Sequence, residues 1–380
     1  MWNNNKEITL GELERIPKED YIYVDVRAAT VYQHGRIPGA INIDIEILKK
    51  DISALPKDKI IVIYCMKGII TIDYVDELRE KGCQVYSLAG GYGEWLMRSF
   101  AHQDHHKEIE KSLQKKFKKE IFNKFTKALN KYDLLQEGDK VAICISGGKD
   151  SMLMAKLFQE LKRYNKFEFD LVFLVMDPGY NEINRQVIEN NAKLMGIPLT
   201  IFNTNIFDAV FNVEKSPCYL CARMRRGHLY KKAKELGCNK IALGHHYDDV
   251  IETILMGMLY GAQIQTMMPK LHSKNFEGME LIRPMYLIRE DDIIKWRKFN
   301  NLNFIQCACR FTDTCSINGD GTGGSKRMEI KRLVKQLKET NPYVESNIFK
   351  SVENVNLTTI ISYKDDDVEH HFLETYGERG

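Results

Sequence analysis

Long apolar segments are absent from this 380-residue sequence. No run of apolar residues approaches the roughly 18 residues that a membrane-spanning helix needs. Residues 1–10 are polar and lack the basic-then-apolar pattern of a secretory signal. These two absences argue against a membrane protein and against a secreted precursor. We therefore expect a cytoplasmic protein with no membrane partner.

A glycine turn in the middle of the chain lacks the spacing of a Walker loop and of a dinucleotide-binding turn. It follows a short, apolar, β-branched run at residues 141–145 and precedes a helix-like pattern from Met152. A strand, a tight turn and a helix N-terminus direct backbone N–H groups and the helix dipole toward one point, which favours phosphate. We therefore expect this turn to bind a nucleotide through Ser146, Gly147, Gly148, Lys149, Asp150 and Ser151.

The S-G-G-K-D-S sequence of this turn resembles the PP-loop of the ATP-pyrophosphatase superfamily. The resemblance implies that ATP is cleaved between its α- and β-phosphates, that a carbonyl oxygen is adenylated and that pyrophosphate is released. Lys149 and Asp150 become catalytic candidates, with ATP and Mg²⁺ as cofactors.

Two further apolar strands end in polar residues. Residues 171–176 precede Asp177, and residues 240–244 precede His245-His246-Tyr247-Asp248-Asp249. In a βαβ sheet, ligands bind at the carboxyl ends of the strands, so we expect one crevice around the PP-loop. Asp177, His245 and Asp248 are nucleotide-binding candidates, and Asp249 is a catalytic candidate. Adjacent carboxylates suit Mg²⁺, although helix capping is the alternative for at least one of them.

Length and charge indicate two folded domains and a polyanionic partner. A chain of 380 residues exceeds one ordinary core. Residues 101–360 carry 40 basic and 31 acidic side chains, whereas both ends are acidic. A basic middle fits a partner such as RNA, although many domains reach this charge without one.

Residues 8–97 alternate short strands, at 21–26, 60–64 and 85–88, with helical segments such as 71–81, which implies a parallel sheet covered by helices on both faces. Cys65 ends the second strand and precedes a helix, where loop amides and the helix dipole stabilise a thiolate. We expect it to be a nucleophile, and a buried structural cysteine is the alternative.

Several motifs around Cys65 resemble the rhodanese domain. They are Asp25-Val26-Arg27, residues 34–42 (H-G-R-I-P-G-A-I-N), and Leu88-Ala89-Gly90-Gly91 with Trp95. The resemblance implies that Cys65 carries a persulfide. The family loop reads C-x-x-G-x-R, and Ile70 stands here in place of the arginine. Without this clamp for an anionic donor, we expect a protein persulfide donor such as a cysteine desulfurase.

Between the two domains, apolar residues recur every four positions among nine lysines in residues 107–131. This pattern predicts one long amphipathic helix that packs its apolar face on the second domain and exposes its lysines to solvent. Direct contact of these lysines with RNA is the alternative. The expected domains are residues 1–100 (sulfur carrier), 101–137 (basic linker helix), 138–350 (PP-loop domain with its cysteine cluster) and 351–380 (acidic tail without an assigned function).

The cysteines of the second domain form two groups. Cys218 and Cys221 form a C-x-x-C followed by Arg223, Arg225 and Arg226, and Cys307, Cys309 and Cys315 follow downstream. Four thiolates would hold a structural zinc ion, and three would hold a [4Fe–4S] cluster with one iron open. The residues alone leave both metals open.

Residues 110–320 are similar to the tRNA 2-thiocytidine synthetase (TtcA) family, on the PP-loop, the C-x-x-C with its arginines, residues 244–249 (G-H-H-Y-D-D), Tyr260-Gly261 and Arg283-Pro284. The similarity implies a [4Fe–4S] cluster held by Cys218, Cys221 and Cys307. Cys309 and Cys315 depart from the family pattern and leave open a fourth ligand or a sulfur relay.

The predicted fold is α/β: a rhodanese-like parallel sheet followed by a doubly wound PP-loop domain of the adenine nucleotide alpha hydrolase type. The predicted function is an ATP-dependent tRNA sulfurtransferase that adenylates a nucleobase carbonyl, cytidine C2, and inserts sulfur that passes through Cys65 and the cluster. The partners are tRNA and a persulfide donor, and a homodimer is the candidate assembly. Two alternatives are sulfur insertion into a small molecule and a zinc-stapled ATP-binding module with an inactive rhodanese domain.

Overall fold

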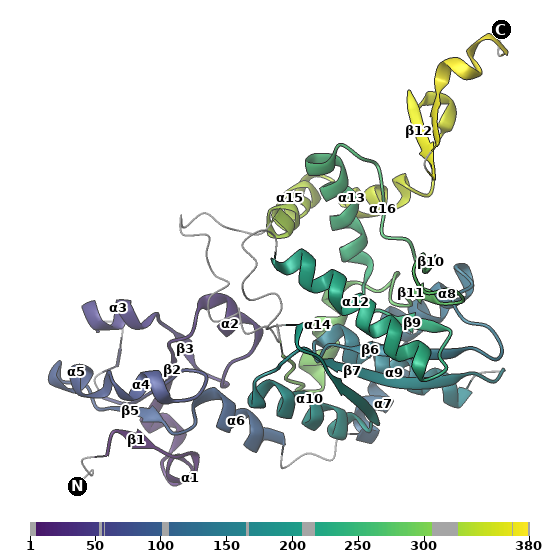
Figure 1. Ribbon diagram of the computed structural model, residues 1–380. Coiled ribbons are helices and arrows are strands. Elements are labelled where there is room, and N and C mark those ends of the chain that lie inside the picture. Colours follow the sequence, from purple (N-terminus) through teal and green to yellow (C-terminus); the bar gives the residue numbers. More distant parts are fainter. Residues whose placement is uncertain are drawn as a thin grey trace.

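The computed structural model describes residues 5–52, 55–56, 58–100, 106–164, 167–206, 217–305, 326–366 and 368–378 (Figure 1). The first domain contains a parallel sheet in the order β1-β5-β4-β2-β3. Its strands are β1 (Glu7–Ile8), β2 (Tyr21–Asp25), β3 (Ile41–Asn42), β4 (Ile60–Tyr64) and β5 (Val85–Leu88). Its helices are α1 (Leu10–Leu13), η1 (Lys18–Asp20), α2 (Ala29–His34), α3 (Ile45–Lys50), α4 (Ile69–Ile72), α5 (Val75–Glu80) and α6 (Gly91–Phe100).

The central strand of this sheet explains why both faces are covered. All five residues of β4 are buried. Ile60, Val62 and Tyr64 belong to one apolar cluster, and Ile61 and Ile63 belong to a second cluster on the other face. The three predicted strands are confirmed. The helix predicted at residues 71–81 is instead two short helices, α4 and α5.

The second domain contains a six-stranded sheet in the order β10-β11-β9-β6-β7-β8, parallel except for the edge strand β10. The chain winds from β6 to β8 in one direction and returns to β9 on the other side of β6, so the order reverses between β6 and β9. The doubly wound fold is confirmed. The strands are β6 (Lys140–Ile145), β7 (Asp170–Asp177), β8 (Leu199–Asn203), β9 (Lys240–Ala242), β10 (Lys270–His272) and β11 (Glu280–Ile282).

Helices cover both faces of this sheet, and a group of helices packs together at one end of the domain (Figure 1). Helices α15 and α16 pack on α13 around Ile251, Ile330 and Phe349. The helices are α9 (Lys149–Tyr164), α10 (Glu182–Met195), α12 (Pro217–Glu235), α13 (Tyr247–Gly261), α14 (Glu290–Phe299), α15 (Lys326–Thr340) and α16 (Val344–Ser351).

The basic segment after the first domain was predicted to be one helix, and this is wrong. It forms three helical segments: α7 (His106–Gln114), a π-helical turn η2 (Lys118–Phe122) and α8 (Asn123–Lys131). The Phe117 N–H donates to the Ser112 carbonyl, and the Phe122 N–H donates to the Phe117 carbonyl, which widens the backbone. The predicted packing is confirmed, because Ile109, Leu113, Phe117, Ile121, Phe125 and Leu129 are all buried in the core of the second domain.

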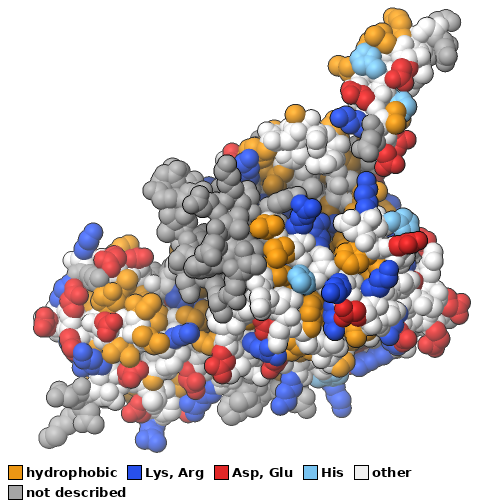
Figure 2. Space-filling view, in the orientation of Figure 1, with side chains coloured by type: hydrophobic (Ala, Val, Ile, Leu, Met, Phe, Trp, Pro, Cys, Tyr) orange, Lys and Arg blue, Asp and Glu red, His pale blue; other side chains and the backbone are white. Residues whose placement is uncertain are grey.

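The C-terminal residues form a hairpin where no structure was predicted. Strands β12 (Ser362–Asp365) and β13 (Val368–His371) pair antiparallel, flanked by the short turns η4 (Leu357–Thr359), η5 (Phe372–Glu374) and η6 (Tyr376–Glu378). This extension projects from the second domain (Figure 1). Its surface exposes large apolar side chains, among them Ile361, Leu373 and Tyr376 (Figure 2).

The two domains pack against each other through α6 and α10, which lie side by side (Figure 1). Val187 and Ile183 of α10 belong to the apolar cluster of the first domain. The Asn190 Nδ2 lies 3.2 Å from Met97 Sδ across the same boundary. Within the described part of the chain, no helix is long and apolar enough to span a bilayer.

A buried ion pair fixes α7 to α9. The Lys156 side chain is fully buried, and its Nζ lies 2.7 Å from Glu110 Oε1 and 2.8 Å from the Met195 carbonyl. Removing one partner of a buried pair leaves an uncompensated charge, which costs about 3–5 kcal/mol. We expect Glu110→Ala to lower the free energy of unfolding by about this amount in urea denaturation. Lys111→Ala, at an exposed position of α7, should change it little. Equal effects of the two variants would contradict this role of Glu110.

Candidate active site

The PP-loop connects β6 to α9 beside the point where the strand order reverses. Gly147 has a φ of +83°, a left-handed conformation that other residues rarely adopt. A Cβ at this position would lie 2.5 Å from a side-chain atom of Ile188 and 2.6 Å from one of Ile305. Both the backbone conformation and the neighbouring side chains therefore require glycine here.

The two serines of the PP-loop hold its shape. The Ser146 N–H donates to Ser151 Oγ at 3.1 Å, and the Ser151 hydroxyl lies 3.1 Å from the Gly148 carbonyl, to which it donates. The two hydroxyl oxygens are 3.2 Å apart. The turn is thus closed by its own side chains before any ligand binds.

Lys149 and Asp150 begin α9 and face the first turn of α14. The Lys149 Nζ lies 3.1 Å from Asp150 Oδ2 and 3.1 Å from Glu290 Oε1. Burial alone would lower the pKa of Lys149, but Asp150 and Glu290 raise it above its ordinary value. A stable positive charge here suits phosphate oxygens. The Asp150 Oδ1 atom is buried and has no hydrogen-bond partner among the described residues.

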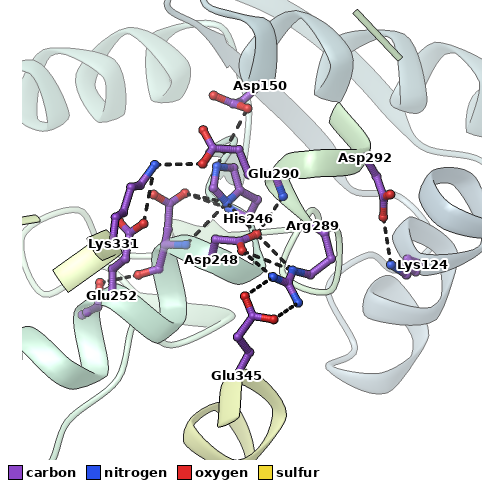
Figure 3. A network of polar contacts seen from close by, with 12 residues as sticks. Lys124, Asp150, His246, Asp248, Glu252, Arg289, Glu290, Asp292, Lys331 and Glu345 are labelled. Atoms are coloured by element: carbon purple, nitrogen blue, oxygen red, sulfur yellow. Dashed lines mark hydrogen bonds and ion pairs between the residues drawn. The ribbon is translucent and has the colours of Figure 1, made fainter. Parts of the chain in front are cut away.

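The loop after β9 lies directly against the PP-loop, as predicted. The Cα of Gly244 is so close that a Cβ would lie 3.2 Å from the Asp150 carbonyl carbon and the Ser151 nitrogen. The His246 side chain is buried, with its Nε2 4.0 Å from Asp150 Oδ1 (Figure 3). Two loops from the strands on either side of the switch point therefore meet, and we call their meeting place the crevice.

The paired aspartates after this loop, in the first turn of α13, both cap helices. The Asp249 carboxylate accepts the His246 N–H at 3.0 Å, while the Asp249 N–H donates to His246 Nδ1. Asp248 instead accepts the Glu290 N–H at 2.7 Å, at the start of α14, and pairs with Arg289 at 2.9 Å (Figure 3). The capping role that the sequence allowed for one aspartate thus applies to both, without removing either from the crevice.

His245 is held neutral at the edge of the crevice. Its Nδ1 lies 3.3 Å from the Arg283 Nε. Burial and the positive charge of Arg283 lower the pKa of His245 to about 4. At neutral pH its imidazole is therefore uncharged and suits stacking or hydrogen bonding better than phosphate neutralisation.

Asp177 lies at the carboxyl end of β7, next to β6, but its carboxylate is bound by its own turn. The N–H groups of Gly179 and Tyr180 donate to Asp177 Oδ1 at 2.9 Å and 2.7 Å, and Arg185 pairs with Oδ2 at 3.0 Å. Asp177 therefore shapes the loop after β7 and lies one strand away from the PP-loop.

The predicted metal ligands are only partly described. Cys218 and Cys221 lie one turn apart in the first turns of α12, although the structure describes their backbone alone. Cys307, Cys309 and Cys315 lie outside the described residues. Among the residues that are described, no group of three or more cysteine, histidine or acidic side chains could hold a metal ion. The described segment that precedes this gap ends at Ile305, two residues before Cys307.

The Cys65 loop forms a tight backbone cradle in the first domain. The Tyr92 and Gly93 N–H groups each donate at 2.9 Å, to the Cys65 and Met66 carbonyls respectively. Gly68 and Gly91 pack so closely that a Cβ on Gly91 would lie 2.5 Å from the Gly68 nitrogen. The Cys65 side chain is 6% exposed.

Sequence reasoning missed three charged residues at the crevice: Glu290, Arg327 and Lys331. The Arg327 Nη1 lies 2.8 Å from Asp249 Oδ1, and the Lys331 Nζ lies 2.8 Å from Glu290 Oε2. Glu290 opens an acidic first helical turn directly after Arg289, a pattern that marks a helix start but not its partners.

Comparison with known proteins agrees with this arrangement. A PP-loop domain model matches residues 113–310, and a rhodanese-like domain model matches residues 9–98. The chain is 33% identical to the tRNA-cytidine(32) 2-sulfurtransferase of Citrifermentans bemidjiense over 240 residues, which are 62% of this chain and 90% of that protein. It is 34% identical to the protein of the same name from Coxiella burnetii over 254 residues, which are 66% and 95% of the two chains.

Among solved structures, the U34-tRNA thiolase NcsA from Methanococcus maripaludis, with its [4Fe–4S] cluster, matches with a TM-score of 0.50. The match has 24% identity and covers 62% of this chain and 78% of the other, so it supports the fold alone. The chain therefore belongs to the PP-loop family, among relatives named tRNA-cytidine(32) 2-sulfurtransferases, and carries a rhodanese-like domain before its PP-loop domain.

Proposed function

We propose that this protein is an ATP-dependent tRNA sulfurtransferase that adenylates the carbonyl oxygen on C2 of cytidine and inserts sulfur delivered through the rhodanese-like domain and an iron–sulfur cluster. One observation carries the proposal. Ile305, two residues before Cys307, packs against both the core of the PP-loop domain and the apolar cluster of the first domain. Two residues span at most about 7 Å of extended chain. The segment that leads to Cys307 therefore starts where both domains and the PP-loop meet.

ATP would bind with its phosphates on the PP-loop. The side chain of Lys149 would contact the departing phosphates, and the buried, unpaired Asp150 Oδ1 fits an Mg²⁺ ion or its water. The cytidine O2 attacks the α-phosphorus and pyrophosphate leaves. A sulfur nucleophile then adds at C2, the C2–O bond breaks and AMP leaves. Asp248, Asp249 and His245 would line this reaction from the second loop.

The donor set fits an iron–sulfur cluster. Cys218 and Cys221 are one helical turn apart, a spacing at which two thiolates can bind one cluster. Cys307 would supply the third ligand. A [4Fe–4S] cluster with three protein ligands supplies one iron with a free coordination position for sulfide.

Cys65 would receive sulfur from a protein persulfide. Its thiolate attacks the terminal sulfur of the donor, and the donor thiolate leaves. A second thiolate then attacks that sulfur, and the Cys65 thiolate leaves. Insertion at the oxidation level of a thiocarbonyl consumes two electrons, which an external dithiol would supply. The exposed side chains of Lys67, Ile69 and Ile70 border this loop and suit a protein donor such as a cysteine desulfurase.

Exposed basic side chains would bind tRNA phosphates. Arg223 and Arg226 are exposed on α12, close in sequence to the C-x-x-C pair. The exposed lysines of α7, η2 and α8 are a second candidate surface, because lysine and arginine neutralise phosphate. The assembly would be a homodimer, which light scattering of the full chain decides.

The first test maps the thionucleosides of tRNA from a deletion strain. Loss of 2-thiocytidine, restored by the wild-type gene and not by a Lys149→Ala copy, is the expected result. An unchanged set of thionucleosides would refute a tRNA substrate and favour sulfur insertion into a small molecule.

The second test separates sulfur delivery from ATP cleavage. With a persulfide donor, we expect Cys65→Ala to release the first equivalent of pyrophosphate at close to the wild-type rate while thiolation falls by about tenfold or more, as loss of a covalent nucleophile implies. Cys83→Ala, at another buried cysteine of the same domain, is the matched control. Undiminished thiolation in Cys65→Ala would mean that the first domain is bypassed.

The third test concerns the metal. Anaerobically purified wild-type protein should absorb broadly near 400 nm and contain iron and acid-labile sulfide in equal amounts. Cys218→Ala, Cys221→Ala and Cys307→Ala should lose this absorbance, whereas Cys238→Ala, at a buried cysteine of the same domain, should keep it. A colourless protein with one bound zinc ion would support the zinc-stapled alternative instead.

A further inference from the structure

A chain of ion pairs joins the PP-loop to three other helices, and Figure 3 labels its members Glu290, Lys331 and Glu252. It starts at Lys149 in α9 and ends at Asp249 in α13. The successive contacts are Lys149–Glu290 at 3.1 Å, Glu290–Lys331 at 2.8 Å, Lys331–Glu252 at 3.6 Å, Glu252–Arg327 at 3.3 Å and Arg327–Asp249 at 2.8 Å. Helices α13, α14 and α15 therefore meet the PP-loop through charge.

Glu290 is the central member of this chain. Its two carboxylate oxygens contact different ammonium groups, Oε1 that of Lys149 and Oε2 that of Lys331. Burial would raise the pKa of Glu290, but Lys149 and Lys331 lower it to about 2. Glu290 is thus ionised at neutral pH. Its backbone is fixed as well, because its N–H donates to Asp248.

Glu290 sets the direction of the Lys149 side chain. Among the described residues, the polar partners of the Lys149 ammonium are Asp150 and Glu290. Asp150 is its sequence neighbour and would also be needed for Mg²⁺. Without Glu290, the ammonium would pair with Asp150 alone and neutralise that carboxylate.

The described residues on both sides of residues 306–325 lie at the crevice. Ile305, the last described residue before this gap, packs on Gly147, and Lys326, the first described residue after it, begins α15. Arg327 and Lys331 lie in the first turns of α15 and pair with Asp249, Glu252 and Glu290. One anchor is apolar and the other is ionic, and both lie at the PP-loop.

We infer that Glu290 is a positioning residue that aims the Lys149 ammonium at the phosphates of ATP, and that Lys331 and Arg327 of α15 hold Glu290 and Asp249 at the same crevice. This inference rests on the proposed use of ATP and names residues that the PP-loop motif does not contain. Charges that contact each other in a partly buried network are energetically coupled, so the effects of substitutions at Glu290 and Lys331 should not be additive.

The decisive comparison is Glu290→Gln against Asp292→Asn. Both residues lie in the first turn of α14, but Asp292 pairs with Lys124, away from the PP-loop (Figure 3). For Glu290→Gln we expect the Kd of ATP–Mg²⁺, measured by equilibrium dialysis, and the KM of ATP for pyrophosphate release to rise about tenfold, equivalent to about 1.4 kcal/mol. The kcat should fall less than threefold. Asp292→Asn should bind ATP as the wild type does.

Two further variants test the role of α15. Lys331→Gln should weaken ATP binding in the wild-type background and have little additional effect in Glu290→Gln, because its partner is already lost. Arg327→Gln should increase hydrogen exchange in the first turns of α15, whereas Arg332→Gln, at an exposed position of the same helix, should not. Glu290→Gln with wild-type Kd and KM would overturn the inference, and so would fully additive effects of Glu290→Gln and Lys331→Gln.

These outcomes are separable from the proposed function. A wild-type protein that binds ATP through Lys149 and Glu290 but thiolates no tRNA would refute the proposed function and leave the inference standing. A wild-type protein that does not bind ATP would refute both.

Discussion

Close approach of three chain segments at the start of α9 is the constraint on which the crevice depends. Gly147 admits Ile305, and Gly244 admits the backbone of Asp150 and Ser151. A side chain at either glycine would push its neighbour away, and at Gly147 it would also force an unfavourable φ. The S-G-G pattern therefore shapes more than a phosphate cradle. It also lets the segment before Cys307 lie on the PP-loop.

The charges of the crevice are balanced before ATP binds. Its carboxylates are matched by nearby cations, and these pairs are partly buried, so each is stronger than a surface pair. Incoming phosphates would replace Asp150 as a partner of Lys149, while Glu290 stays in contact with the ammonium. The Lys149 ammonium then exchanges one anionic partner for another. This exchange costs less reorganisation energy than stripping water from an unpaired ammonium. The network thus holds Lys149 in position while leaving its positive charge able to bind phosphate.

The sequence predicts those features that depend on local patterns. The strands, the PP-loop, the loop after β9 and the packing of residues 107–131 follow from periodicity and from the rule that strand ends meet at one edge. The break near Phe117 was missed because the wider π-turn keeps the four-residue spacing of buried side chains. Glu290 was missed because its partners, Lys149 and Lys331, are far from it in the chain. No local spacing reports a contact between residues 141 positions apart.

The placement of Asp248 and Asp249 shows a further limit of pattern reading. Adjacent carboxylates beside a phosphate loop suggest a metal pair, yet each caps a different helix. Capping and catalysis are compatible when the second carboxylate oxygen stays available. For Asp249 that oxygen pairs with Arg327 of α15, so a ligand or metal ion could contact it only by sharing or displacing this arginine. The chemistry of the motif therefore depends on a helix 78 residues away in the chain.

The contact between the two domains bears on how sulfur would move. A carrier on a flexible tether raises the local concentration of persulfide but must find its target by diffusion. Here α6 and α10 pack apolar side chains together, and Gly93, whose N–H binds the Cys65 loop, lies so close to Ile183 that a Cβ would be 3.2 Å away. The Cys65 loop is thus braced against the PP-loop domain. In the proposed reaction, a braced carrier favours a short transfer to Cys307, two residues after Ile305 in the chain, over a swing of the whole domain, because any swing would first expose this apolar contact to water.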